Sequence, residues 1–107
     1  MGISKTHNFN DYQNMVANIA KGFSHPARVA ILEYIINHKS CIVGSLTDVI
    51  PLSQSTISQH LKELKNLGII KGEIEGPSIC YCIDEKNWSK LSGALKTLIN
   101  RISENCC

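Results

Sequence analysis

The sequence predicts a mainly α-helical domain with one small β-hairpin, arranged as a winged helix-turn-helix. Three observations predict this fold. A helix with one apolar and one hydrogen-bonding face lies between Pro51 and Gly68. The spacing of apolar residues then changes from helical to alternating over residues 70–83. After Asn87 it becomes helical again, which predicts one last helix.

Length and composition are typical of one small globular domain. The chain has 107 residues, of which 43% are hydrophobic and 19% are charged, and its formal net charge is +2. This mild positive charge permits nucleic-acid binding but does not require it. We expect residues 1–10 to be flexible and residues 11–107 to form the domain. No apolar stretch resembles a membrane span or a signal peptide, so we expect a cytoplasmic protein without membrane contact.

Two helices are expected first. Apolar residues recur at helical spacing from Tyr12 onward, which predicts a helix over residues 11–21. Ser24 and Pro26 mark the start of a second helix, because proline is well tolerated in the first helical turn. We expect this second helix to end near residues 37–39.

A short third helix is expected in the segment before Pro51. Ser45 is followed three residues later by Asp48, and this pair resembles a capping box. Pro51 ends this short helix, and a tight turn over residues 51–53 leads into the next helix. A short helix, a turn and a longer helix together make a helix-turn-helix.

The longer helix has two contrasting faces. The Ser53 hydroxyl can cap its start, and Gly68 can end it in a left-handed conformation. At about 100° per residue, Ile57, Leu61 and Leu64 share one face. The opposite face begins with short neutral side chains, which can donate and accept hydrogen bonds at base edges. We predict base contacts from Gln54, Ser55, Ser58 and Gln59, and phosphate contacts from Thr56 and Lys62.

Residues 70–74 and 78–83 alternate as the two strands of a hairpin, the wing. The alternation predicts Ile79, Tyr81 and Ile83 on one face, and Cys80 and Cys82 on the other. Lys71 is the wing residue that we expect to assist DNA binding. The acidic Glu73 and Glu75 predict that contacts between the wing and DNA are weak.

The last helix carries a broad apolar stripe, composed of Trp88, Leu91, Leu95, Leu98, Ile99 and Ile102. In so small a domain, this surface is expected to pack against a second copy of the chain rather than against a filled core. The fold class is therefore a winged helix-turn-helix that dimerises through its terminal helices.

Three segments resemble the ArsR/SmtB family of small bacterial winged-helix repressors: FSHPARVAILEYI, LSQSTISQHLKELKNLGII and EGPSICYCID. The resemblance covers roughly residues 12–102. It implies a homodimer that binds a palindromic double-stranded DNA operator. It also implies release from that operator by a thiophilic or transition metal ion or, in some members, by a sulfur or redox signal.

The sequence departs from the family's metal sites at informative positions. The zinc site between the last helices of some members corresponds here to Glu85, Asn87, Leu98 and Arg101. The Cys-x-Cys pair of members that sense trivalent arsenic would fall near Ile42 and Gly44. This chain has Cys41 instead, displaced by one position, so a sensor must be built from its own cysteines.

Five cysteines in a chain without secretory features are metal ligands, redox sensors or buried fillers rather than a disulfide framework. Soft thiolates select soft ions, and three sulfurs satisfy trivalent arsenic or antimony. We predict a site composed of Cys41, Cys106 and Cys107, with Cys80 and Cys82 as a second candidate site. Arsenic(III) or antimony(III) is the favoured effector, ahead of zinc or cadmium, and DNA binding itself requires no cofactor. The alternative signal is oxidation or persulfide formation on the same thiols.

Other functions are less well supported by the residues. The sequence does not predict an enzyme, because a thiol oxidoreductase or metal chaperone would need Cys-x-x-Cys beside a βαβ unit or a base beside its nucleophile. The acidic wing leaves open a winged helix that binds protein rather than DNA. His60 lies on the flank of the apolar stripe, so we predict a packed or backbone-bonded histidine rather than a base-reading one.

Overall fold

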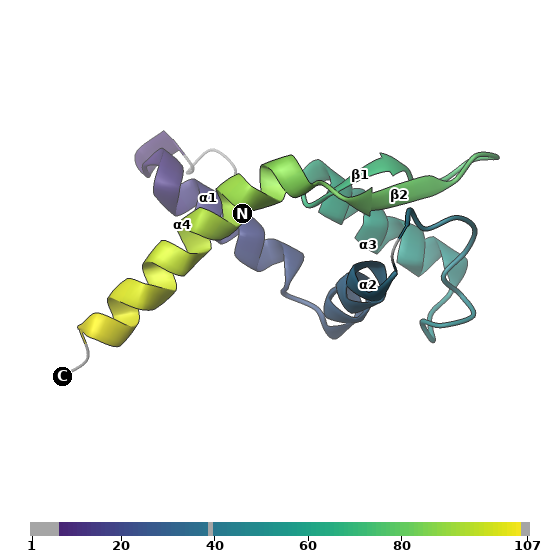
Figure 1. Cartoon of the computed structure of the whole chain (residues 1–107), viewed down its shortest axis with the longest axis horizontal. Coiled ribbons are helices and arrows are strands. Elements are labelled where there is room, and N and C mark those ends of the chain that lie inside the picture. Colours follow the sequence, from purple (N-terminus) through teal and green to yellow (C-terminus); the bar gives the residue numbers. More distant parts are fainter. Residues whose placement is uncertain (1–6, 39, 106–107) are drawn as a thin grey trace.

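The computed structural model describes residues 7–38 and 40–105. This part of the chain forms four helices and one hairpin, arranged as in Figure 1. In chain order the elements are α1 (Asp11–Gly22), α2 (Pro26–Asn37), α3 (Gln54–Asn66), β1 (Ile70–Glu73), β2 (Cys80–Ile83) and α4 (Glu85–Glu104). The predicted mainly helical fold with a hairpin wing is confirmed. Within the described ranges, no helix combines enough length with enough apolar character to cross a membrane.

One hydrophobic core joins α2, α3 and the hairpin. Buried side chains from both helices and both strands fill this core. They include Ile31 and Ile35 of α2, Ile57, Leu61 and Leu64 of α3, and Ile70 and Tyr81 of the strands. The segment between α2 and α3 adds Ile42, Leu46 and Ile50. The apolar face predicted for α3 is therefore fully buried, and its polar face is left on the outside.

Each of the first two helices begins at a side-chain cap. Asn10 and Gln13 form a reciprocal capping box at α1, with hydrogen bonds of 2.7 and 3.1 Å. At α2 the cap is His25, whose Nδ1 accepts a 3.0 Å hydrogen bond from the backbone N–H of Ala27. Ser24 instead donates its hydroxyl to the carbonyl of Lys21, so it ends α1 rather than starting α2.

The predicted short helix before Pro51 is wrong. This segment contains only one hydrogen-bonded turn, in which the N–H groups of Val49 and Ile50 both donate to the carbonyl of Leu46. Ser45 does not cap three residues ahead. Its hydroxyl accepts from the N–H of Thr47 at 3.1 Å. The backbone N–H of Asp48 therefore has no capping bond to Ser45. Without that bond, the single turn does not extend into a helix.

The hairpin pairs β1 with β2 in antiparallel register, from Ile70 opposite Ile83 to Glu73 opposite Cys80. Its strands are shorter than predicted, because residues 74–79 belong to the connection. Gly72 has a φ of 110°, and a side chain there would collide with the backbone of Cys80. Gly68, with a φ of 81°, ends α3 in the left-handed conformation that its sequence predicts.

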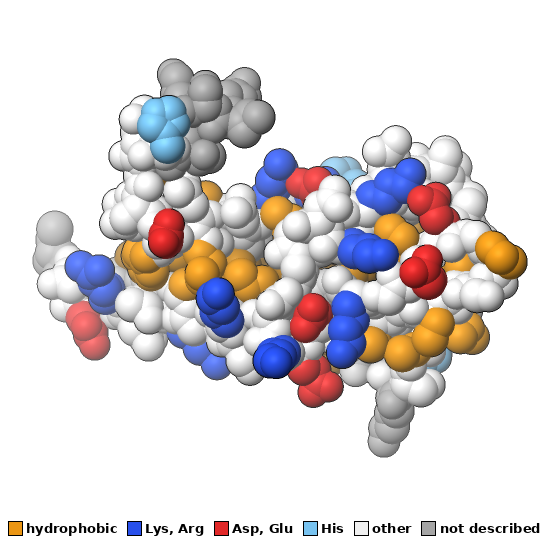
Figure 2. Space-filling view, turned by 90° about the horizontal axis from the view of Figure 1, so that it is seen from above, with side chains coloured by type: hydrophobic (Ala, Val, Ile, Leu, Met, Phe, Trp, Pro, Cys, Tyr) orange, Lys and Arg blue, Asp and Glu red, His pale blue; other side chains and the backbone are white. Residues whose placement is uncertain are grey.

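Helix α4 starts earlier than predicted, because Asp84 caps it with a 3.2 Å hydrogen bond from the N–H of Asn87. It crosses α1, and the edge-on rings of Phe23 and Trp88, with centroids 6.0 Å apart, lie near its beginning. No residue of α4 is fully buried within this chain. Figure 2 shows hydrophobic side chains gathered on the left of the view, over α1 and α4.

Candidate nucleic-acid interface

The start of α3 is held by its own polar side chains. The Ser53 hydroxyl accepts a 3.3 Å hydrogen bond from the N–H of Thr56 and therefore caps the helix as predicted. The same hydroxyl lies 3.0 Å from Thr56 Oγ1 and 3.2 Å from Ser55 Oγ. The first turn thus presents a cluster of hydroxyl groups at the positive end of the helix dipole, where a phosphate oxygen is favoured.

Gln54 is fixed between two neighbours. Ser45 donates its hydroxyl to Gln54 Oε1 at 2.6 Å, and Gln54 Nε2 donates to Ser58 Oγ at 3.3 Å. These bonds tie the turn before Pro51 to the exposed face of α3. A side chain that is already ordered loses less conformational entropy when it binds a partner, so these bonds preorganise the Gln54 side chain for binding.

The predicted base-reading side chains lie together on one surface. Gln54, Ser55 and Gln59 are exposed, and Ser58 is half-buried beside them. Within the described residues, the Gln59 side chain makes no hydrogen bond, so its amide is free for a partner. The four side chains therefore form one continuous polar row whose donors and acceptors match those of base edges.

The predicted phosphate contacts are less free than the sequence suggests. Lys62 forms an ion pair with Glu75 of the wing, with Nζ and Oε1 3.6 Å apart. Lys71 is exposed on β1, where it pairs in register with Cys82. Figure 2 shows basic and acidic side chains interleaved over the middle of the molecule. The wing therefore adds no strongly positive surface, and its weak contribution to DNA binding stays a prediction.

His60 is a packed residue with a side-chain partner. Only 9% of it is exposed, its ring lies tilted against that of His25 with the centroids 4.8 Å apart, and its Nδ1 accepts a 3.1 Å hydrogen bond from Arg28 Nε. Burial, and then the charge of Arg28, lower the pKa of His60 below its ordinary value. Its predicted packing is confirmed, although its partner is a side chain and not the backbone.

Arg28 is a positioning residue that the sequence analysis did not find. Besides bonding His60 of α3, its Nη1 donates a 2.7 Å hydrogen bond to the carbonyl of Lys21 at the end of α1. One guanidinium thus ties α1, α2 and α3 together. The only sequence signal was its place in the SHPAR segment, which does not indicate a partner 32 positions away.

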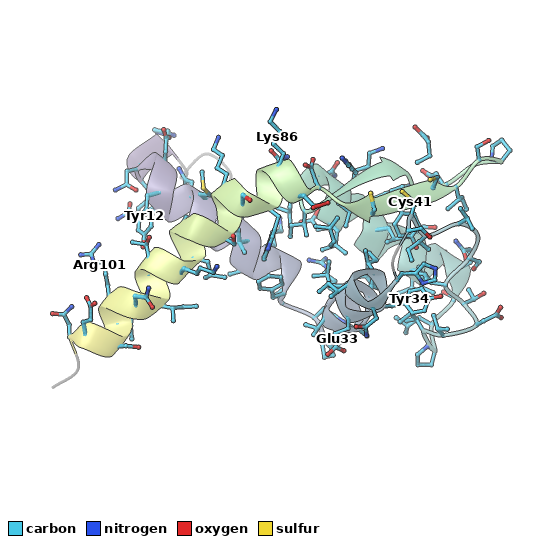
Figure 3. All side chains as sticks on the ribbon, in the orientation of Figure 1. Tyr12, Glu33, Tyr34, Cys41, Lys86 and Arg101 are labelled. Carbon is cyan, nitrogen blue, oxygen red and sulfur yellow. The ribbon has the colours of Figure 1, made fainter. Side chains whose placement is uncertain are left out.

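The structure regroups the predicted thiols. An isolated antiparallel bridge pairs Ile42 with Tyr81, which places Cys41 beside β2 and next to Cys82. Figure 3 labels Cys41 at this position beside the hairpin. Cys106 and Cys107 lie outside the described residues, and the end of α4 lies at the opposite end of the molecule from the hairpin. The site that combines Cys41 with the terminal pair therefore stays a prediction.

Comparisons with known proteins agree with this geometry. Residues 25–71 match the family model described as a bacterial regulatory protein of the arsR family. The transcriptional repressor PagR of Bacillus anthracis is 33% identical over 82 residues, covering 77% of this chain and 79% of the relative. The cadmium resistance regulatory protein CadC homolog of Staphylococcus aureus is 34% identical over 76 residues, covering 71% of this chain and 63% of the relative.

A solved structure shares the fold. The crystal structure of Rv0081 from Mycobacterium tuberculosis matches with a TM-score of 0.55 and 22% identity, over 90% of this chain and 96% of that one. The matched segment of the family model contains α2, the turn before Pro51 and α3, which are the elements that hold the polar row. The chain therefore belongs to the ArsR family of bacterial regulatory proteins, a family of helix-turn-helix transcriptional regulators.

Proposed function

We propose that the chain is a homodimeric transcriptional repressor that binds a palindromic operator through α3 and is released by a thiophilic effector. The observation that carries the DNA-binding part is the division of α3 into two faces. Ile57 and Leu64 on its inner face are 0% exposed. The outer face presents the row of Gln54, Ser55, Ser58 and Gln59. A helix fixed in this way can enter the major groove with its first turns against base edges.

Replacement of two central members of this row tests the operator contact. The double variant Ser58→Ala and Gln59→Ala removes a hydroxyl and an amide from the outer face and leaves the buried apolar side chains of α3 unchanged. We expect it to abolish specific binding to DNA from upstream of its own gene, at a fixed salt concentration, in an electrophoretic shift assay. An unchanged affinity would overturn the assignment of α3 as the reading helix.

A matched control separates recognition from general damage. Ser89 and Asn100 are exposed on α4, so Ser89→Ala with Asn100→Ala removes the same kinds of group elsewhere. This control should bind the operator as the parent protein does. Circular dichroism of both double variants should match that of the parent protein, because neither pair is buried.

Dimerisation through α4 is proposed because this helix carries an apolar stripe that its own chain leaves open. Ile99 is 52% exposed and Ile102 is 63% exposed. Exposed apolar surface of this kind is typical of a subunit interface. A dimer also supplies two copies of α3, as a palindromic operator requires.

The proposed effector is a soft ion, with arsenic(III) or antimony(III) favoured over cadmium or zinc. The chain's thiols supply soft sulfur ligands, and a relative named for cadmium resistance supports this class of effector. Hydrogen bonding with Cys41 raises the pKa of Cys80, and burial raises the pKa of Cys82. Because the thiolate is both the nucleophile and the metal ligand, a raised thiol pKa slows oxidation by peroxide, and an ion that binds must displace the thiol protons.

Titration of the reduced protein–operator complex distinguishes these signals. We expect arsenite to release the DNA at lower concentration than cadmium or zinc, and we expect peroxide to act more slowly than arsenite. Release by peroxide alone would overturn the arsenic proposal and favour the redox alternative.

A further inference from the structure

Cys41 and Cys82 lie opposite each other beside an antiparallel β-bridge, which joins two segments that are far apart in the sequence. The N–H of Ile42 donates to the carbonyl of Tyr81 at 2.7 Å, and the N–H of Tyr81 donates to the carbonyl of Ile42 at 3.1 Å. These reciprocal bonds define an antiparallel bridge, so the residue before Ile42 lies opposite the residue after Tyr81. Side chains that lie opposite each other across antiparallel strands have Cβ atoms about 4.5–5.5 Å apart.

Cys80 lies on the same face as this pair. Side chains alternate along a strand, so Cys80 and Cys82 both point away from the face of Tyr81, which is 1% exposed in the core. Ile42 is buried on that core face as well, which turns Cys41 toward the side of the two wing cysteines. Cys80 is thus the diagonal neighbour of Cys41, within reach of a side chain that turns toward it.

The ionisation of the wing cysteines reports the same arrangement. Hydrogen bonding with the Cys41 side chain is the first cause that raises the pKa of Cys80. It is the second cause for Cys82, after burial. The bridge between Ile42 and Tyr81 places Cys41 opposite Cys82 and diagonal to Cys80, so the three cysteines lie on one face of the strands.

The cluster is open to a small solute. Cys41 and Cys82 line a pocket of about 460 Å³ together with His38 and Glu85, and Cys80 lies outside its lining. Cys80 is exposed, and the other two thiols are half-buried. Arsenous acid, which is small and neutral at physiological pH, can enter such a pocket without an electrostatic barrier.

We propose that Cys41, Cys80 and Cys82 form a single three-sulfur site at the base of the wing, which binds arsenic(III) or antimony(III). This inference rests on the proposed function, because it assigns the effector site of the repressor. It replaces the pairing of Cys41 with the chain terminus and uses only residues of one subunit. The occupant is a trivalent ion, because three thiolates drawn together on one face can supply the three sulfurs of its pyramidal coordination.

The binding reaction balances without an oxidant or a reductant. Each of the three thiols gives up its proton, three arsenic–oxygen bonds of arsenous acid break, and three arsenic–sulfur bonds form. Three water molecules leave, and the oxidation state of arsenic and of sulfur does not change.

Binding must draw the three thiols together. In the described part of the chain, no group of three His, Cys, Asp or Glu side chains could hold a metal ion as arranged. An ion that gathers the sulfurs therefore pulls the segment at Cys41 toward β2. This segment continues to Ser45, which bonds Gln54 at the start of α3. The wing is tied to α3 by Lys62 and Glu75, so both connections move the reading helix.

Arsenic binding by reduced protein without DNA tests the site directly. The double variant Cys106→Ser and Cys107→Ser serves as the parent, because it removes the competing terminal thiols. After anaerobic incubation with sodium arsenite and gel filtration, we expect one arsenic per chain by elemental analysis. Addition of Cys41→Ser, Cys80→Ser or Cys82→Ser should each abolish this retained arsenic.

Two results would overturn the site. One is loss of arsenic in the Cys106→Ser and Cys107→Ser parent, and the other is its retention after Cys80→Ser is added. Circular dichroism and operator binding without arsenite establish that each variant is folded. Failure of the proposed function gives a different pattern, in which the folded Cys106→Ser and Cys107→Ser parent binds arsenic but no operator.

Discussion

Helices α3 and α4 both carry an apolar stripe along one side, and the two stripes meet different surroundings. In α3 the stripe packs into the core of its own chain, and Ile57 and Leu64 are 0% exposed. In α4 no residue is fully buried, and Ile102 is 63% exposed. Because the apolar side of α3 is buried in its own chain, only its polar side is exposed to a partner. In α4 the apolar side is still exposed. We therefore propose that the same amphipathic pattern serves DNA recognition in one helix and self-association in the other.

The largest effect should follow from damage to the buried stripe. Leu64→Ala leaves a cavity in a site that is fully enclosed, so we expect it to reduce the free energy of unfolding by about 2–5 kcal/mol. Urea unfolding at several protein concentrations measures this loss, which should not depend on concentration. Leu98→Ala in α4 is the matched control, and its effect should vary with concentration because its partner is a second chain. Equal, concentration-independent losses in both variants would remove the distinction between the two helices.

Charges on the open stripe should separate the subunits. Ile99→Glu with Ile102→Glu places two carboxylates in the proposed interface, and burial of such charges without partners is strongly unfavourable. We expect the dimer to become a monomer in sedimentation velocity, with helical content retained in circular dichroism.

The control for this change is Thr97→Glu with Asn100→Glu. It adds the same charges at the same spacing, at exposed positions on the opposite side of α4. This variant should remain a dimer. If both pairs of glutamates leave the mass unchanged, α4 is not the interface.

A smaller effect is expected where the wing meets α3. Glu75→Gln frees Lys62 from its exposed ion pair, so we predict a severalfold tighter operator complex and a stability change of less than about 1 kcal/mol. The slope of log affinity against log salt concentration should steepen by roughly one, because one more lysine reaches phosphate. Glu104→Gln, at the far end of α4, removes the same charge and should leave the slope unchanged. A weaker complex in Glu75→Gln would instead show that this carboxylate assists binding.

The smallest effect concerns the pH dependence of folding. The pKa of His60 is lowered by burial, by Arg28 and by His25. Below the ordinary histidine pKa of about 6.5, the unfolded chain therefore binds more protons than the folded chain. The contribution of neutral His60 to stability is complete above that pKa and is lost as the pH falls.

Urea unfolding between pH 7.5 and pH 5.5 measures this loss. We expect His60→Gln to lose less stability than the parent protein over this range. His38→Gln, which changes an exposed histidine, should behave like the parent protein. The same pH dependence in all three proteins would exclude His60 as the titrating group.

Features with a local cause could be predicted from the sequence. Ser53 caps α3 through a bond to a residue three positions away, and Gly68 ends it because glycine tolerates a positive φ. The alternation that buries Tyr81 and exposes Cys80 is equally local. The fold and the two faces of α3 followed from such signals.

Features that depend on distant partners could not be predicted in this way. Ser45 was expected to cap a helix, but its hydroxyl accepts from the N–H of Thr47 and donates to Gln54, which lies nine positions away. The bridge between Ile42 and Tyr81 sets which thiols meet Cys41. The spacing of apolar residues along the chain does not indicate which residues pair in this bridge. The grouping of the cysteines is therefore visible only in the structure.

The central claim is that the outer face of α3 reads DNA while α4 does not. Backbone amide resonances of the isotope-labelled protein, recorded with and without a duplex from upstream of its own gene, test both halves at once. If α3 reads the DNA, the largest shifts should occur at Ser55, Ser58 and Gln59, with a smaller shift at Lys71 and little change from Ser89 onward in α4. Largest shifts along α4, with the α3 resonances unmoved, would contradict it.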